Sequence, residues 1–175
     1  RIYDVDKIKI HGGSIRIYAC HKKNNKIKTV SKVKRLLIEE KSFGLDSLNA
    51  YQNFQEKAER IKNDMLDFLI RQKRKGKKII AYGAAAKGNT LLNYAGIKTD
   101  LISSVFDAAP SKQGKFLPGS HIPILSPTKI NYKKPDYIVI FPWNLKKEIK
   151  KDILDKTKNK NIKFVTFIPH LKIYA

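Results

Sequence analysis

The stretch "AYGAAAKGNTLLNYAG", residues 81–96, decides the fold. It continues the apolar run "KKIIAY", passes through a turn of small residues, and takes a helical pattern from residue 87 until Gly96 closes the helix. A strand that turns through glycine and alanine into a helix is typical of nucleotide-binding α/β domains. The turn also leaves backbone N–H groups at the start of a helix, where an anion can bind.

Strands and helices alternate throughout the chain after Gly76. Continuous apolar runs separated by helical segments predict a parallel sheet that helices cover on both faces, and therefore an α/β, Rossmann-like domain. The predicted strands are residues 78–83, 101–107, 136–143 and 163–170, the predicted helices are residues 87–96 and 144–159, and a long loop follows the second strand.

The first 76 residues predict a strand and a long linking helix. Residues 14–20, "SIRIYAC", alternate like a strand after the turn "HGGS", whereas "VKRLLIEEKSFG" is ambiguous and includes a short helix among its interpretations. Apolar residues recur at three- and four-residue spacing from Leu48 to Leu69. This spacing predicts a helix that Asp46 or Ser47 caps and that Gly76 ends.

The composition excludes several classes of protein. The one cysteine, Cys20, leaves no disulfide framework and suits the reducing cytoplasm. No apolar run is long enough to predict a membrane span, and the N-terminus shows no signal peptide. The missing initiator Met leads us to expect a fragment or a processed chain. Cys20, His21 and His11 lack the number and spacing of ligands that a metal site requires.

The formal net charge of +22 is typical of proteins that bind nucleic acid. Only six of the 37 basic residues are Arg, and none lies beyond Arg74. Groove-reading and phosphate-clamping proteins favour Arg for its bidentate geometry, so this excess of Lys favours a solvated lysine coat. A basic nucleic-acid-binding module remains an alternative.

The glycine loop matches neither of the two well-known phosphate-binding patterns in full. Gly83, Gly88 and Thr90 have P-loop spacing, but Asn89 stands where the P-loop lysine would be, which disfavours NTP hydrolysis. In the dinucleotide pattern G-x-G-x-x-G, Ala85 replaces the second glycine. An NAD-type Rossmann oxidoreductase therefore remains a further alternative.

Candidate binding residues follow the carboxyl ends of the predicted strands, where parallel sheets hold their ligands. Asp107 ends the second strand, at the place of a ribose-binding acid or of a simple turn former. Lys112, Lys115 and His121 lie in the long loop, and Trp143 either stacks on a base or sugar or packs at a strand end. The expected substrate-binding residues are Gly83, Ala84, Ala85, Lys87, Gly88, Asn89, Thr90, Asp107, Lys112, His121, Trp143 and Asn144.

Four segments in order resemble the C-terminal domain of the S-adenosylmethionine-dependent sugar C-methyltransferases. They are "HGGSIRIYA", "AYGAAAKGNTLLNYAGI", "DAAPSKQGKFLPGSHIPI" and "PDYIVIFPWNLKKEI", and the resemblance extends over nearly the whole chain. The resemblance implies a Rossmann-like domain that helps to hold a nucleotide-diphosphate sugar with a keto-deoxysugar. In that family a base removes the proton beside the ketone, and the carbanion takes the methyl group of the cofactor.

The resemblance also implies parts that this chain does not contain. One is a cysteine-rich zinc module, and the other is the catalytic domain that binds S-adenosylmethionine and carries a Tyr-x-Glu-His stretch. We therefore expect no catalytic residue, metal or cofactor site here, and we expect the remaining domains of the same polypeptide as partners. The expected division is residues 1–42 as the edge of the catalytic domain, 43–76 as a linking helix and 77–175 as the Rossmann-like domain.

Overall fold

The structure is a computed structural model that describes residues 1–131, 134–157 and 161–174. The chain divides into two compact units, Arg1–Glu56 and Lys57–Ala175. Among the described residues, none of the helices has both the length and the apolarity that crossing a membrane requires. The three-part division expected from the sequence stays a prediction about the native polypeptide.

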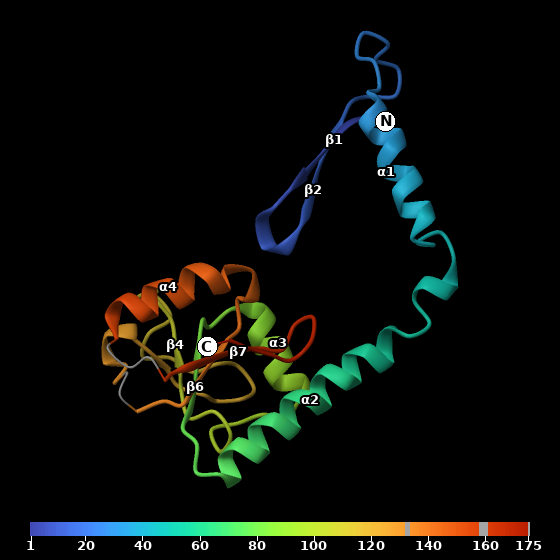
Figure 1. The fold of residues 1–175 in the computed structure, drawn as a ribbon. Coiled ribbons are helices and arrows are strands. Elements are labelled where there is room, and N and C mark those ends of the chain that lie inside the picture. Colours follow the sequence, from blue (N-terminus) through green and yellow to red (C-terminus); the bar gives the residue numbers. More distant parts are fainter. Residues whose placement is uncertain (132–133, 158–160, 175) are drawn as a thin grey trace. The chain divides into compact units, whose positions relative to one another are not determined.

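The first unit is a hairpin with one helix packed on it (Figure 1). Strands β1 (Ile2–Ile8) and β2 (Ser14–Ala19) pair antiparallel, and the turn between them contains the short helix η1 (Ile10–Gly12). Helix α1 (Ser31–Ser42) packs against β1, where Lys32 Nζ donates to the Asp6 carboxylate at 2.8 Å. The strand predicted at 14–20 is confirmed, and the ambiguous segment is a helix. The sequence does not predict β1, because its apolar and charged residues mix on both faces.

Helix α2 (Phe54–Arg74) begins later than the sequence predicts. The prediction of a cap at Asp46 or Ser47 is wrong, because the chain first forms the short helix η2 (Leu48–Ala50) and the Ser47 hydroxyl donates backwards to the Gly44 carbonyl at 3.0 Å. Leu48 is 83% exposed, so the first turns of the apolar stripe are not core. Spacing alone could not separate this exposed part from the buried part.

The far end of α2 is as predicted. Gly76 has a φ of 70°, and its N–H donates to the Lys73 carbonyl while the Lys77 N–H donates to the Gln72 carbonyl. These bonds satisfy the last carbonyls of the helix, and glycine adopts this left-handed conformation without steric cost.

The second unit contains a six-stranded sheet in the order β5-β4-β3-β6-β7-β8. All neighbours pair parallel except β8, which pairs antiparallel with β7. The bounds are β3 Ile79–Tyr82, β4 Val105–Phe106, β5 Ile124–Leu125, β6 Tyr137–Ile140, β7 Lys163–Thr166 and β8 Lys172–Tyr174. The α/β, Rossmann-like fold with a mostly parallel sheet is therefore confirmed.

The structure corrects several element boundaries. The strand predicted at 101–107 shrinks to β4, and the sequence does not predict β5 and β8, which have two and three residues and are too short to show a period. Helix α4 (Lys146–Lys156) lies inside the predicted helix 144–159, whose last two residues lie outside the described residues. Two further short helices are η3 (Pro127–Lys129) and η4 (Trp143–Leu145).

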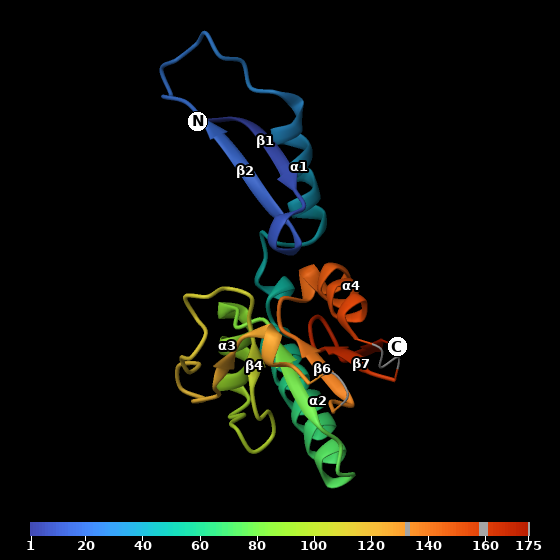
Figure 2. The same ribbon diagram turned by 90° about the vertical axis from the view of Figure 1, so that its left-hand side faces the viewer.

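Helices cover both faces of the sheet (Figure 2). One face carries α2 and α3 (Ala86–Tyr94), with a core that includes Met65, Leu69, Leu92, Ala81 and Val139. The other face carries α4, with a core that includes Ile153, Tyr82, Phe106, Ile138 and Phe164. Successive residues of β3 and β6 thus point to opposite cores, which is why their runs are apolar throughout.

The order in which the chain adds strands to the sheet reverses between β3 and β6. It leaves β3 through α3 toward β4 on one side, and it leaves the neighbouring β6 through α4 toward β7 on the other side. The two departing loops diverge at the carboxyl ends of β3 and β6, the place where doubly wound sheets form a crevice. This topological switch point is where open α/β sheets bind their ligands.

Candidate binding site at the carboxyl edge of the sheet

Two glycines bring the β3–α3 turn close to the end of β6. Gly83 has a φ of 88°, and a Cβ added to it would lie 2.4 Å from Pro142 Cδ. A Cβ added to Gly88 would lie 2.5 Å from both Cβ and Cγ of Phe141. Both contacts are far shorter than the 3.5–4.0 Å of ordinary carbon contacts, so only glycine fits at either position. The small residues therefore have a packing role.

The N–H groups of the turn itself are occupied by the protein. The Gly83 N–H donates to the Phe106 carbonyl at 2.7 Å, the Ala84 N–H to Asp107 Oδ2 at 2.7 Å, and the Ala85 N–H to the Gly83 carbonyl at 2.8 Å. The expectation of open amides is therefore wrong for these three residues, because a carboxylate of the chain already takes the anion position. The helix N-terminus at this edge is the first turn of α3, which begins at Ala86, and such turns have N–H groups with no carbonyl one turn earlier in the helix.

Asp107 acts as the anchor of this edge. It is 8% exposed, and its other oxygen accepts from the Ala109 N–H at 2.8 Å, so it is also a turn former. Lys112 Nζ donates to Asp107 Oδ2 at 3.1 Å and to the Ala84 carbonyl at 3.0 Å. Gln113 Nε2 donates to the Asp107 carbonyl at 3.0 Å. Asp107 and Lys112 thus fix the β3–α3 turn through their hydrogen bonds to Ala84.

A lysine and a tryptophan meet across the crevice. Lys87, in the first turn of α3, places its Nζ 5.1 Å from the centre of the Trp143 ring, which belongs to η4 after β6. This separation is within the range of a cation–π interaction. Lys87 is exposed and Trp143 is half-buried, so a ligand can reach both. Exposed Asn144 lies beside Trp143 in η4.

Asn89 and Thr90 lie in the same part of α3. The Asn89 Oδ1 atom is buried and, among the described residues, accepts no hydrogen bond. Such an acceptor is costly to leave unsatisfied, so it suits a donor from a ligand or water. The Thr90 hydroxyl instead donates to the Ala86 carbonyl of its own helix at 3.1 Å.

The loop residue His121 lies away from this crevice. It directly precedes the strand region of β5 and has a φ of 56°, in a turn where its N–H donates to the Leu117 carbonyl. Residues that precede a parallel strand lie toward the amino edge of the sheet. Exposed Lys115 pairs through its backbone with Ile124 of the same strand. The structure thus brings Lys87, Asn89, Trp143 and Asn144 to one edge, without His121.

The sequence prediction missed four residues that shape the edge. Phe141 and Pro142 form the wall against which the two glycines pack, and Gln113 braces Asp107. Asn93 donates to the Asn89 carbonyl at 3.0 Å and to the Pro118 carbonyl at 3.0 Å, which ties α3 to the long loop. The two glycines could have indicated Phe141 and Pro142 from the sequence, because a helical or turn position held by glycine often marks a close approach of another backbone segment.

Metal ligands do not gather at this edge. Within the described residues, no group of three or more His, Cys, Asp or Glu side chains could hold a metal ion. The chemistry of the crevice is that of an ammonium group, an amide oxygen, an aromatic ring and a helix N-terminus, which together suit a ligand with a phosphate and a flat or polar body.

Two comparisons with known proteins point to one family. The family model described as "C-methyltransferase C-terminal domain" matches residues 9–169. The C-methyltransferase NovU of Streptomyces niveus is 34% identical over 150 residues, which are 85% of this chain and 35% of the relative. The chain thus spans about a third of that relative's length. A UDP-D-quinovosamine 4-dehydrogenase from Vibrio fischeri is 17% identical with a TM-score of 0.40, over 57% of this chain and 93% of that one, and so weak a likeness carries no argument. The chain belongs to the C-methyltransferase C-terminal domain family.

Proposed function

We propose that this chain holds the nucleotide-diphosphate part of a nucleotide-linked keto-deoxysugar for a C-methyltransferase that uses S-adenosylmethionine. The observation that carries the proposal is the meeting of Lys87 with Trp143 across the switch point, beside the first turn of α3. The remaining domains of the same polypeptide would supply the catalytic groups, because we assign no residue of this chain to proton abstraction or methyl transfer.

The parts of the crevice suit the parts of such a ligand. A diphosphate carries its charge on oxygens that the first-turn amides of α3 and the Lys87 ammonium group can bind. The Trp143 ring offers a flat surface for a base or a sugar. The buried Asn89 Oδ1 can accept from a sugar hydroxyl.

The same edge does not fit S-adenosylmethionine. In Rossmann-like cofactor sites an acid at the end of the second strand receives the ribose hydroxyls. Here that acid is Asp107, whose carboxylate already accepts from the Ala84 and Ala109 N–H groups and from Lys112. We therefore place the cofactor, and any zinc, in the remaining domains of the polypeptide.

The tryptophan provides a direct test, because Trp143 is the only one in the chain. Titration of the 175-residue chain with uridine- or thymidine-diphosphate glucose should change its fluorescence to saturation. Lys87→Gln should weaken binding about tenfold, the effect of losing one charged hydrogen bond. Asn89→Ala should weaken it less, by about fivefold. Lys151→Gln, an exposed lysine on α4, is the matched control and should bind as the parent does.

Two outcomes would reject the proposal. One is an unchanged fluorescence signal at millimolar ligand, which would leave the domain a docking or structural role. The other is equal weakening in the Lys87 and Lys151 variants, which would reduce the binding to general attraction by the lysine coat. NADH should not compete with the nucleotide sugar, since the Ala84 N–H already donates a hydrogen bond to the Asp107 carboxylate.

A further inference from the structure

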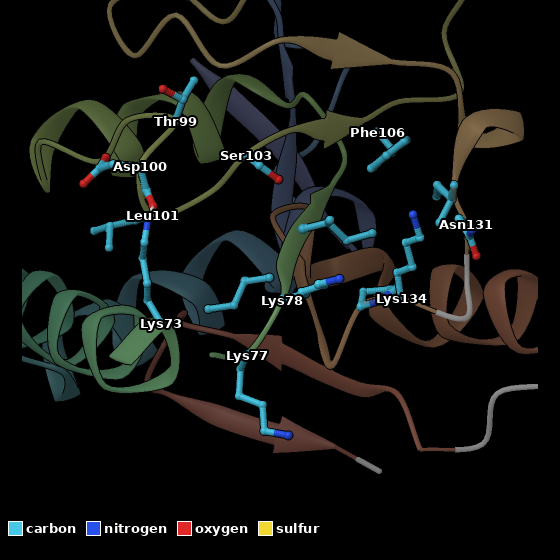
Figure 3. A pocket seen from close by; sticks show the side chains of 14 residues that line it. Lys73, Lys77, Lys78, Thr99, Asp100, Leu101, Ser103, Phe106, Asn131 and Lys134 are labelled. Carbon is cyan, nitrogen blue, oxygen red and sulfur yellow. Dashed lines mark hydrogen bonds between the residues drawn. The ribbon is translucent and has the colours of Figure 1, made fainter. Parts of the chain in front are cut away.

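A second hollow opens at the amino edge of the sheet, away from the crevice just described (Figure 3). It encloses about 390 Å³, within the range of small-molecule sites. Lys77 and Lys78 lead into β3, Ser103 precedes β4, and Lys134 and Pro135 precede β6. All its lining residues belong to the second compact unit.

The inner wall of the hollow is apolar. It presents the sheet residue Ile80 and the edges of two buried side chains, Phe106 and Ile130, which are 5% and 7% exposed. This wall lies on the α4 face of the sheet, because Ile80, Phe106 and Ile130 belong to the core cluster of that face. An apolar surface in a concave place can take the flat body of a ligand.

Of the four lysines that line the hollow in the described part of the chain, two already have partners. Lys77 Nζ bonds Asp136 at 2.9 Å, which raises the pKa of the lysine, and in Figure 3 its amine points away from the hollow. Lys73 Nζ donates to the Asp100 carbonyl. Both carboxylate oxygens of Asp136 accept hydrogen bonds, because the second oxygen accepts from the Lys78 N–H at 2.9 Å.

The other two lysines, Lys78 and Lys134, differ from these, although the charge of Lys78 also helps to lower the pKa of Asp136. Within residues 1–131, 134–157 and 161–174, no hydrogen bond or ion pair reaches the ammonium groups of Lys78 and Lys134. They line the same hollow from two different segments, with the hydroxyls of Thr99 and Ser103 also on its wall. One acidic residue, Asp100, also lines the hollow, so the described lining residues carry four lysines against one acid. An excess of positive charge around one concave, partly apolar space attracts an anion more strongly than scattered surface lysines do.

We propose that this hollow binds a small organic phosphate with an aromatic or otherwise flat apolar body. A phosphomonoester carries nearly two negative charges at neutral pH, which matches the two unpaired ammonium groups, and lysine binds phosphate as a point charge. Ser103 and Thr99 can donate to its oxygens, while its body rests against Ile80 and Phe106. The inference does not depend on the proposed function, because it concerns the opposite edge of the sheet.

The test uses the 175-residue chain and probes that separate the two parts of the ligand. Calorimetric titration with phenyl phosphate should show saturable binding, and inorganic phosphate should bind at least about tenfold more weakly because it lacks the ring. Lys78→Gln and Lys134→Gln should each weaken phenyl phosphate binding by about tenfold. Both side chains are exposed, so neither variant should change the thermal melt. Lys151→Gln should bind as the parent does.

Each contrary result overturns the inference. Phenyl phosphate that does not saturate below about 5 mM would mean that there is no site. Equal affinity for inorganic and phenyl phosphate would mean charge attraction without a pocket. The same loss in Lys151→Gln would assign the binding to the lysine coat. Weaker binding of phenyl phosphate by Lys87→Gln, together with unchanged binding by Lys78→Gln, would place the probe at the carboxyl edge of the sheet.

Discussion

Replacing Gly88 with alanine tests whether α3 really lies against the end of β6. In an exposed helix this change would stabilise the protein by about 1 kcal/mol, because alanine is the better helix former. Here the added Cβ would lie 2.5 Å from Cβ and Cγ of Phe141, whose side chain is 3% exposed. Phe141 Cβ is fixed to the backbone, so α3 or β6 must move by about 1 Å to restore an ordinary contact.

The magnitude follows from these opposing effects. Overpacking of a filled core costs about 1–3 kcal/mol, and a contact with a backbone-bound atom belongs at the upper end. Subtracting the helix preference leaves a net loss of about 2 kcal/mol in the free energy of unfolding. For a chain of this length that loss lowers Tm by roughly 4–8 °C.

Two other glycines separate the contact from the backbone conformation. Gly76→Ala meets no atom within 4 Å but has a φ of 70°, so it should cost about 1 kcal/mol of left-handed strain alone. Gly83→Ala combines a φ of 88° with a Cβ only 2.4 Å from Pro142 Cδ, so its loss should be the largest, about 4 kcal/mol.

The assay is thermal and urea unfolding followed by circular dichroism, with Trp143 emission as a local probe of the crevice. The expected order of stability is parent, Gly76→Ala, Gly88→Ala, Gly83→Ala. A Gly88→Ala protein as stable as the parent or more so, beside a destabilised Gly76→Ala, would refute the close packing of α3 on Phe141.

Three further changes probe the anchor, the amino edge and the core. Asp107→Asn weakens the acceptor of the Ala84 N–H and of a lysine, so unfolding in urea should show a loss of about 1.5–3 kcal/mol. Asp136 has its pKa lowered from 3.8 by Lys77 and by a backbone N–H, so its contribution is present above about pH 4 and is lost as pH falls through the lower folded pKa. The stability difference between the parent and Asp136→Asn should therefore shrink as pH falls from about 5 to 2 in urea titrations. Leu69→Ala, at a fully buried position of α2, should lower the free energy of unfolding by about 2–5 kcal/mol.

Each change has a control on the same chain. Asp155→Asn alters an exposed carboxylate of α4 and should stay within about 0.5 kcal/mol of the parent. Leu48→Ala alters a side chain that is 83% exposed and should be equally mild. A pH-independent difference for Asp136→Asn would contradict the ion pair, and a Leu69→Ala loss no larger than that of Leu48→Ala would contradict the packing of α2 on the sheet.

The sequence by itself determined the fold class of the second unit. The runs 79–82 and 137–140 are apolar on every residue, which is the pattern of strands buried on both faces. Gly76 and Gly96 marked helix ends because a left-handed turn favours glycine wherever it occurs. These signals are local, so no distant contact was needed to interpret them.

The tertiary structure alone decided how the candidate site is arranged. The direction of the Asp107 carboxylate depends on the Ala84 amide, which belongs to a neighbouring strand end, so the sequence could not show that the acid occupies the turn. Lys87 of α3 and Trp143 of η4 follow different strands and meet only because the order of the strands reverses between β3 and β6. The apolar residues around Leu48 share the spacing of the buried stripe of α2, and only packing distinguishes exposed from buried positions with the same period. Side-chain partners far apart in sequence are fixed by strand order, which no local pattern encodes.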